Sequence, residues 1–499
     1  MSCMYYNSNQ NFNETLLFIH SIGESSSVWA GISPWLAPEH KIITVDLWGH
    51  GNSMTLNSDL SLKSLADDLY NVLINAGSPD CYVIGDKFGC IPAISLAYYY
   101  PESIKGILLV DGFHTFNDLH IEKINANVLL KKRQDMIIEF MDKLNTNENK
   151  KLLSEITDVS ELTCKRYFNI ISSESINLLY ELTCPYAFLI SDSNTGPLLN
   201  KKYGVSESAI FGNDNLVSNL FLIESSTNTI NNIKKAITYL KQEYQNIIKN
   251  KVNVFFSKQA NGYYKSTMHS SEGLGDVIKL LDVNNESSVI DLGCGAGHTS
   301  YALAPHAKQV IAYDLSKNML DIVNNTKDKL KLRNIFTEQG DIDVLNFKND
   351  TFDRAVSRIA AHHFPNLPGF LNELGRVLKK GGLFLLVDNT APEDPDLFVF
   401  TEIAEKIKDS SHFRLYTESF WKESLYKANF TIDYIQRYKS VHNFEEWAEV
   451  ASLDENTKDR LQKIFLESSK KIKDYFKIKI EKNKVLEFTI DRIIIRAWV

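Results

Sequence analysis

Residues 288–297 read Ser-Val-Ile-Asp-Leu-Gly-Cys-Gly-Ala-Gly. This pattern is typical of a short buried strand that turns through a glycine loop into a helix, and the glycines let the backbone pass close beneath a ligand. An acidic residue about 20 positions later suits the ribose hydroxyls of a nucleoside, and Asp314 lies 21 residues after Gly293. The stretch therefore predicts an α/β fold that binds a nucleoside.

Three further segments follow in order: Gly340-Asp341, Phe352–Arg358 and Leu378–Asp388. With the glycine loop, they resemble the class I S-adenosylmethionine-dependent methyltransferases, especially the small-molecule enzymes of ubiquinone and menaquinone synthesis. The resemblance covers roughly residues 250–499. It implies S-adenosylmethionine as the cofactor and a Rossmann-like, seven-stranded methyltransferase domain.

The resemblance also implies which residues bind the cofactor. They are Asp291, Gly293 and Gly295 at the methionine moiety, Asp314 and Leu315 at the ribose and the adjoining ring face, Asp341 and Ile342 at the adenine, and Arg358 at the methionine end. Residues 256–269 are similar to a leader that folds over the donor in these enzymes. Within it, Tyr263 and His269 are candidates for the cofactor carboxylate or the acceptor pocket, or they are packing residues.

His362 and His363 follow the fourth predicted strand, where the acceptor faces the methyl group. Either imidazole could take a proton from an acceptor hydroxyl or amine near neutral pH. We prefer His363 as the catalytic base because members of the family commonly carry histidine there. Adjacent histidines on a loop rarely bind one ion without further ligands, so we expect no metal.

Residues 389–450 normally shape the acceptor pocket in the related enzymes. His412 and Arg414 could bind an anionic acceptor there. Alternatively, Arg414 pairs with Glu393 or Asp394, a surface arrangement that needs no ligand.

The first half of the chain resembles the α/β-hydrolase family. The resemblance rests on Phe18–His20, Val45–Ser53 and Tyr82–Gly89, within apolar segments that alternate with amphipathic helical patterns and so predict a parallel sheet. We expect a helical cap at about 117–182, a last strand at Phe221–Glu224 and a closing helix at Ile230–Ile248.

The hydrolase chemistry is not preserved. The family's G-x-S-x-G nucleophile elbow reads Gly85-Asp86-Lys87-Phe88-Gly89, and an ammonium in place of serine cannot form an acyl-enzyme. Ser21 stands where the family generally has a glycine, the acid loop offers Asp192 or Asn194, and no histidine follows residues 221–224. A catalytically silent fold is the main interpretation. A carboxylate-binding or Schiff-base role for Lys87, or residual esterase activity, is the alternative.

Length and charge define the class of protein. A chain of 499 residues exceeds one ordinary core, which predicts two domains, 1–248 and 249–499, joined near Asn246–Lys251 before a second βα pattern begins at Phe255-Phe256. A net charge of −8 disfavours nucleic acid as a partner.

The six cysteines lack the spacing of a metal site or a disulfide framework. Neither an apolar leader nor a membrane span is evident, so we expect a cytoplasmic protein that does not bind membranes.

The sequence thus predicts methyl transfer from S-adenosylmethionine to a small metabolite, in a biosynthetic pathway, with a pseudo-hydrolase domain for binding, stability or assembly. One alternative is a hydrolase or lyase that uses Lys87 beside a domain that senses S-adenosylmethionine. The other is a non-catalytic binding or scaffold protein.

Overall fold

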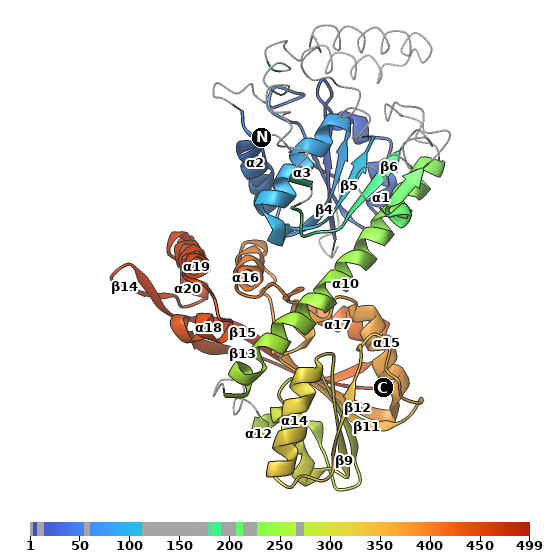
Figure 1. The fold of residues 1–499 in the computed structure, drawn as a ribbon, viewed down its shortest axis with the longest axis vertical. Coiled ribbons are helices and arrows are strands. Elements are labelled where there is room, and N and C mark those ends of the chain that lie inside the picture. Colours follow the sequence, from blue (N-terminus) through green and yellow to red (C-terminus); the bar gives the residue numbers. More distant parts are fainter. Residues whose placement is uncertain are drawn as a thin grey trace. The chain divides into compact units, whose positions relative to one another are not determined.

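The structure is a computed structural model that describes residues 3–6, 14–53, 60–111, 163, 167, 178–179, 181–190, 206–212, 227–265 and 274–499. The chain forms two compact units, Met1–Tyr244 and Gln245–Val499. The predicted boundary at 248 lies a few residues beyond this division. Both units are α/β, as predicted (Figure 1).

The first unit contains a seven-stranded sheet in the order β1-β3-β2-β4-β5-β6-β7. Its strands are β1 (Cys3–Tyr6), β2 (Thr15–Ile19), β3 (Lys41–Val45), β4 (Cys81–Asp86), β5 (Ile104–Val110), β6 (Tyr186–Ile190) and β7 (Ile210–Gly212). Only β1 pairs antiparallel among these strands. Every residue of β2, β4 and β5 is buried, as expected for parallel strands that are covered on both faces.

Helices cover both faces of this sheet. They are α1 (Ser33–Leu36), α2 (Leu62–Asn75), α3 (Cys90–Tyr99) and the first part of α10 (Thr227–Lys265). One core lies under α2 and α3, and a second lies under α10, where Ile233, Ile237 and Leu240 pack on β2, β4 and β5. The predicted cap at 117–182 falls largely outside the described residues, and the predicted strand Phe221–Glu224 lies wholly outside them.

The join predicted at Asn246–Lys251 lies beside the division between the units, but the βα pattern expected after it does not begin at Phe255-Phe256. Asn246–Lys251 lies inside the continuous helix α10, and Phe255-Phe256 belongs to the same helix rather than to a new strand. The physical reason is visible in the sequence, because neither proline nor glycine interrupts the segment from Thr227 until Gly262.

The second unit contains an eight-stranded sheet with the path β10-β9-β8-β11-β12-β15-β13, and β14 pairs with β15 beside this path. The strands are β8 (Ser288–Leu292), β9 (Gln309–Asp314), β10 (Ile335–Gln339), β11 (Phe352–Arg358), β12 (Leu378–Asn389), β13 (Thr431–Asn443), β14 (Lys479–Glu481) and β15 (Lys484–Trp498). The first five strands of the path are parallel, β15 pairs antiparallel with β12, and β13 pairs antiparallel with β15.

Helices follow most of these strands (Figure 1). They are α12 (Leu274–Leu281), α13 (His298–Leu303), α14 (Lys317–Lys329), α15 (Leu367–Val377), α16 (Pro395–Lys408), α17 (Glu418–Lys427), α18 (Phe444–Val450), α19 (Glu455–Glu467) and α20 (Lys470–Tyr475). Because β8, β9, β10, β11 and β12 are parallel, their carboxyl ends meet at one edge of the sheet, which is where ligands bind in such folds. Among the described residues, no helix has both the length and the hydropathy of a membrane span.

Candidate active site

The glycine loop after β8 is built from three residues with positive φ. Gly293, Gly295 and Gly297 have φ of +69°, +52° and +87°, a region that strongly favours glycine. A Cβ on Gly297 would lie 2.8 Å from the Tyr301 ring and 2.9 Å from Val323, so this glycine allows close helix packing. A Cβ on Gly295 would meet nothing within 4 Å. The loop is therefore closed at Gly297 and open at Gly295.

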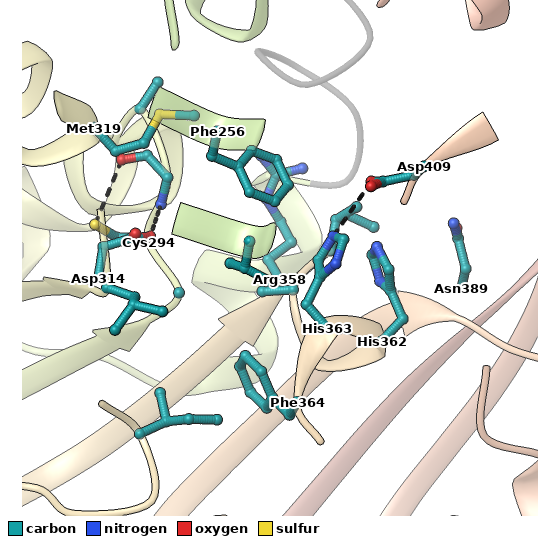
Figure 2. A pocket seen from close by; sticks show the side chains of 18 of the residues that line it. Phe256, Cys294, Asp314, Met319, Arg358, His362, His363, Phe364, Asn389 and Asp409 are labelled. Carbon is teal, nitrogen blue, oxygen red and sulfur yellow. Dashed lines mark hydrogen bonds and ion pairs between the residues drawn. The ribbon is translucent and has the colours of Figure 1, made fainter. Parts of the chain in front are cut away.

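A cavity lies over this loop, at the carboxyl edge of the sheet. Nine of the twelve predicted site residues line it: Gly293, Gly295, Asp314, Leu315, Asp341, Ile342, Arg358, His362 and His363. Figure 2 shows Asp314 and Met319 on one side of this pocket and His362, His363 and Asn389 on the other. The side chain of Tyr263 and the whole of His269 lie outside the described residues.

Asp314 ends β9 directly beside the open part of the loop. Its Oδ2 accepts a hydrogen bond from the Gly295 N–H at 2.8 Å, and its Oδ1 accepts one from the Ser316 N–H at 2.8 Å. Burial raises the pKa of this carboxyl, although the backbone hydrogen bonds oppose the shift. Each carboxylate oxygen has a second lone pair, so Asp314 can still accept hydrogen bonds from a vicinal pair of hydroxyls.

Asp341 lies beyond β10 and is tied to a residue that the sequence did not indicate. The ammonium of Lys249 donates to Asp341 Oδ2 at 2.7 Å, and it also pairs with Asp343. Asp341 Oδ1 accepts from the Asp343 N–H. Lys249 and the predicted Ile342 both line the cavity, so this corner combines a charged pair with an apolar side chain.

Asp291 is buried and is absent from the side chains that line the cavity. Its Oδ2 accepts a hydrogen bond from the Ser300 hydroxyl of α13 at 2.6 Å. Burial raises the pKa of Asp291 to about 6, and the nearby Arg358 opposes that shift. Arg358 in turn donates to the Thr299 hydroxyl at 2.9 Å. The placement favours a role in fixing the loop against α13, while direct contact of Asp291 with a ligand stays a prediction.

His362 is oriented by a buried carboxylate. Its Nδ1 lies 2.7 Å from Asp388 Oδ1, and its backbone N–H donates to Asp388 Oδ2. Burial lowers the pKa of His362, but the Asp388 carboxylate outweighs this effect and raises the pKa above its usual value. With Nδ1–H directed at Asp388, the remaining nitrogen, Nε2, is the proton acceptor of the ring.

His363 has a different environment although it is the adjacent residue. Its Nδ1 lies 3.0 Å from the Ser411 carbonyl oxygen, and because a carbonyl only accepts hydrogen bonds, Nδ1 must carry the proton. Its Nε2 is 3.9 Å from Asp409 Oδ2. Burial lowers the pKa of His363, and the neighbouring His362 lowers it further. The ring also packs edge-on against Phe256 (Figure 2). His363 is therefore a weaker base than His362.

Other cavity residues were not singled out from the sequence. They include Lys249, Lys408, His442, Trp447 and Arg492, which belong to α10, α16, β13, α18 and β15. Of these, Lys408, His442 and Trp447 lie in the region 389–450 that was expected to shape the acceptor pocket, and Phe256, which also lines the cavity, begins the predicted leader. The alternation of Phe488, Ile490 and Arg492 along β15 places these side chains on one face of the sheet, and this is the signal that could have found Arg492.

His412 and Arg414, the predicted ligands of an anionic acceptor, are not among the side chains that line the cavity. His412 is buried with its Nε2 3.4 Å from Glu402 Oε1, and the Arg414 guanidinium lies over the Phe398 ring at 5.2 Å.

The elbow after β4 is a sharp turn that carries lysine at the nucleophile position of the G-x-S-x-G pattern. Lys87 occupies the sharp turn into α3 with a φ of +46°, a strained conformation for a residue with a side chain. Its ammonium lies 3.3 Å from Asp86 Oδ2. Asp86 is buried, and burial raises its pKa. The strand, turn and helix are as predicted.

Two histidines near the elbow are held in hydrogen bonds to the backbone. His20 accepts from the Leu47 N–H at Nε2 and contacts the Ser21 carbonyl through Nδ1. His50 accepts from the Gly23 N–H at Nε2, and burial lowers its pKa to about 3. Both rings thus bind backbone groups of the surrounding loops. Asp192, Asn194 and residues 221–226 lie outside the described residues.

In the part of the chain that the structure describes, no group of three or more histidine, cysteine or acidic side chains is placed to hold a metal ion. Cys81, Cys90, Cys184 and Cys294 are buried free thiols.

Comparison with known proteins gives a match for each unit. The family model of a methyltransferase domain matches residues 290–386, and the family model of the alpha/beta hydrolase fold matches residues 14–141. An uncharacterized methyltransferase of Bacillus subtilis (strain 168), YcgJ, is 31% identical over 245 residues, which are 48% of this chain and 96% of that protein.

Further similarities fall in the same half. A demethylmenaquinone methyltransferase of Staphylococcus saprophyticus is 32% identical over 123 residues, which are 24% of this chain and 52% of that protein. The crystal structure of Bacillus subtilis YcgJ aligns with 30% sequence identity and a TM-score of 0.45, over 45% of this chain and 97% of that one.

Proposed function

The chain belongs to the S-adenosylmethionine-dependent methyltransferase family, and we propose that it methylates a small-molecule acceptor in the cavity of its second unit. The sulfonium of the donor supplies an already activated methyl group. The protein therefore has to position donor and acceptor in line, exclude water and, for a protonated acceptor, remove a proton. The single observation that carries the proposal is the convergence of the open glycine loop, Asp314 and the His362–Asp388 pair on one cavity.

The residues around the glycine loop fit this cofactor. Gly295 leaves open space where any other residue would place a side chain. Asp314 faces that space with lone pairs available for the two ribose hydroxyls, which match a carboxylate in spacing and polarity. Ile342 and Leu315 offer apolar contacts for a purine, and Arg358 offers positive charge for the methionine carboxylate. The donor would bind along this side.

We assign the role of general base to His362 rather than to His363. Asp388 holds the His362 ring in one tautomer and stabilises its protonated form, as a base needs when it takes a proton. His362 Nε2 would accept the proton of an acceptor hydroxyl or protonated amine. His363, whose Nδ1 is directed at the Ser411 carbonyl, would position the acceptor and pack under Phe256.

The first unit would act as a pseudo-hydrolase domain in this proposal. Lys87 replaces the nucleophile, and the two described histidines near the elbow are committed to backbone groups. We propose that this unit serves binding, stability or assembly in a cytoplasmic biosynthetic enzyme, which accords with the demethylmenaquinone methyltransferase among its relatives.

The proposal is tested by incubating the full chain with methyl-labelled S-adenosylmethionine and a metabolite extract, followed by mass spectrometry of the small molecules. We expect a labelled product that is lost with His362→Ala and kept with Lys87→Ala. Label that appears in no metabolite, or that appears equally with His362→Ala, would contradict the assigned chemistry.

A further inference from the structure

Part of the same cavity is lined by buried polar atoms that lack partners. Neither ring nitrogen of His442 has a hydrogen-bond partner among the described residues, nor does the indole N–H of Trp447. His442 is 3% exposed and Trp447 is 4% exposed, and both line the cavity. A buried polar atom without a partner costs about 1–3 kcal/mol, so such atoms commonly mark the place of a ligand.

The two side chains are brought together by one aromatic ring. His442 on β13 lies opposite Phe488 on β15 in the antiparallel register. The His442 ring stacks on Phe488 with a centroid distance of 5.8 Å, and the Trp447 ring contacts Phe488 edge-on at 5.0 Å. Directly opposed residues share a face of a sheet, as do alternate residues of one strand. His442, Ile490 and Arg492 therefore project from one face, toward the cavity that all three line.

This end of the cavity carries positive charge. Arg492 is 3% exposed and lines the cavity beside Asn389, whose Oδ1 accepts from Arg492 Nε at 3.2 Å. Lys408 also lines it, with its ammonium 4.8 Å from the centre of the Trp447 ring and 2.8 Å from Glu405 Oε2. Burial lowers the pKa of His442 to about 3, and the charges of Arg492 and Lys408 contribute. The local field thus disfavours another cation.

From this arrangement we infer that His442, Trp447, Lys408 and Arg492 form a subsite for an anionic group of the acceptor, a carboxylate or a phosphate. The inference rests on the proposed function, since it specifies the substrate class of the same cavity. An anion would accept hydrogen bonds from the indole N–H, an imidazole N–H and the guanidinium, and charge-assisted bonds of this kind are strong. Glu405 pairs with Lys408, and Arg492 adds a second positive charge at this end of the cavity.

The acceptor would then have two distinct ends. One end presents the hydroxyl or amine to His362, and the other places its anion at Arg492. The indole of Trp447 and the ring of Phe256 also line the cavity, which suits an aromatic body between the two ends.

The test uses three probes of similar shape: benzoate, phenyl phosphate and the neutral benzamide. Each is titrated by saturation-transfer NMR into the full chain, with and without S-adenosylhomocysteine. We expect at least one anion to bind about tenfold or more tightly than benzamide. The tighter of the two anions identifies carboxylate or phosphate as the preferred group.

Variants locate the effect. Arg492→Gln should remove the preference for the anion, and Trp447→Phe should weaken it, while the affinity for S-adenosylhomocysteine stays unchanged. Arg437→Gln is the matched control, because Arg437 lies on β13 near Asp491 and does not line the cavity. Equal binding of the anions and benzamide, or a preference that survives Arg492→Gln, overturns the inference. Failure of S-adenosylhomocysteine to bind the wild type overturns the proposed function instead, and the titration without it still decides the subsite.

Discussion

The two units contain the same local structure, a parallel strand that turns sharply into a helix, and they use it in opposite ways. After β4, the glycines let chain segments pack together, and a Cβ on Gly85 would lie 2.6 Å from the Gly89 carbonyl. After β8, a Cβ on Gly295 would meet nothing. The first turn is filled by protein, and the second leaves room for a ligand.

The side chains at the two turns also differ in whether they bind protein groups or face a cavity. Lys87 stands on the elbow beside the buried Asp86, and His20 and His50 are bound to backbone groups. In the second unit, Asp314 retains lone pairs beside the open loop, and Asp388 orients His362 at the cavity. The comparison shows that two turns of similar backbone geometry can differ in their side-chain chemistry, because the geometry depends on glycines and packing while the chemistry depends on a few polar side chains.

The largest effect should come from the base. His362→Ala should slow methyl transfer by roughly a hundredfold or more, because general base catalysis typically contributes that much, while donor affinity stays nearly unchanged. His363→Ala should reduce the rate less, because the His363 ring positions the acceptor and does not take up its proton. Steady-state kinetics with a labelled donor would measure both. A greater rate loss for His363→Ala would return the role of base to that residue.

Two glycine substitutions test the contrast between closed and open turns. Gly297→Ala should lower the free energy of unfolding of the second unit by about 2–4 kcal/mol, through overlap with Tyr301 and Val323 and an unfavourable φ. Gly295→Ala should cost only about 1 kcal/mol, because its Cβ meets nothing. Denaturant unfolding measures both changes. If Gly295→Ala were as damaging as Gly297→Ala, the loop would not be open as described.

The pH dependence of turnover tests the Asp388 carboxylate. His362 must be deprotonated to act as a base, and Asp388 raises its pKa above 6.5, so the rate should rise with pH through that raised value. Asp388→Asn removes the negative charge, which should lower the pKa of His362. The pH range over which the rate rises should then move to lower pH, and the maximal rate should fall by about tenfold or more. If Asp388→Asn left the pH–rate profile in place, the titrating group would be one other than His362.

The smallest effect is expected in the first unit. Lys87→Ser restores the nucleophile of the elbow, yet it should not confer hydrolysis of p-nitrophenyl esters above the wild-type level, because the chain has no histidine between His120 and His269 to activate the serine. Clear turnover by this variant would show that the remaining hydrolase machinery is intact. It would contradict the proposal that the first unit has no catalytic role.

The sequence predicted the fold well where local signals and packing agree. The strand before Gly293, the acid at Asp314 and the elbow at Lys87 all lie where their motifs indicated. It was wrong about Phe255-Phe256, where a second βα pattern was expected to begin, because the segment contains nothing that breaks the helix α10.

The candidate site was predictable only in part. Residues at strand ends could be found because parallel strands bring their carboxyl ends together. His442 and Trp447 lie in the region 389–450 that was expected to shape the acceptor pocket, but they could not be singled out individually, because their place in the cavity depends on the antiparallel pairing of β13 and β15. The contrast between His362 and His363 also required coordinates, since it depends on which ring faces Asp388.

Calorimetric titration of S-adenosylhomocysteine into the full chain tests the central claim most directly, that the cofactor binds at the open turn of the second unit. The wild type and Lys87→Ala should bind alike, and Asp314→Ala should bind about 1–3 kcal/mol more weakly, because the ribose hydroxyls lose a charged acceptor. Absence of binding to the wild type, or equal binding by Asp314→Ala, would contradict the account.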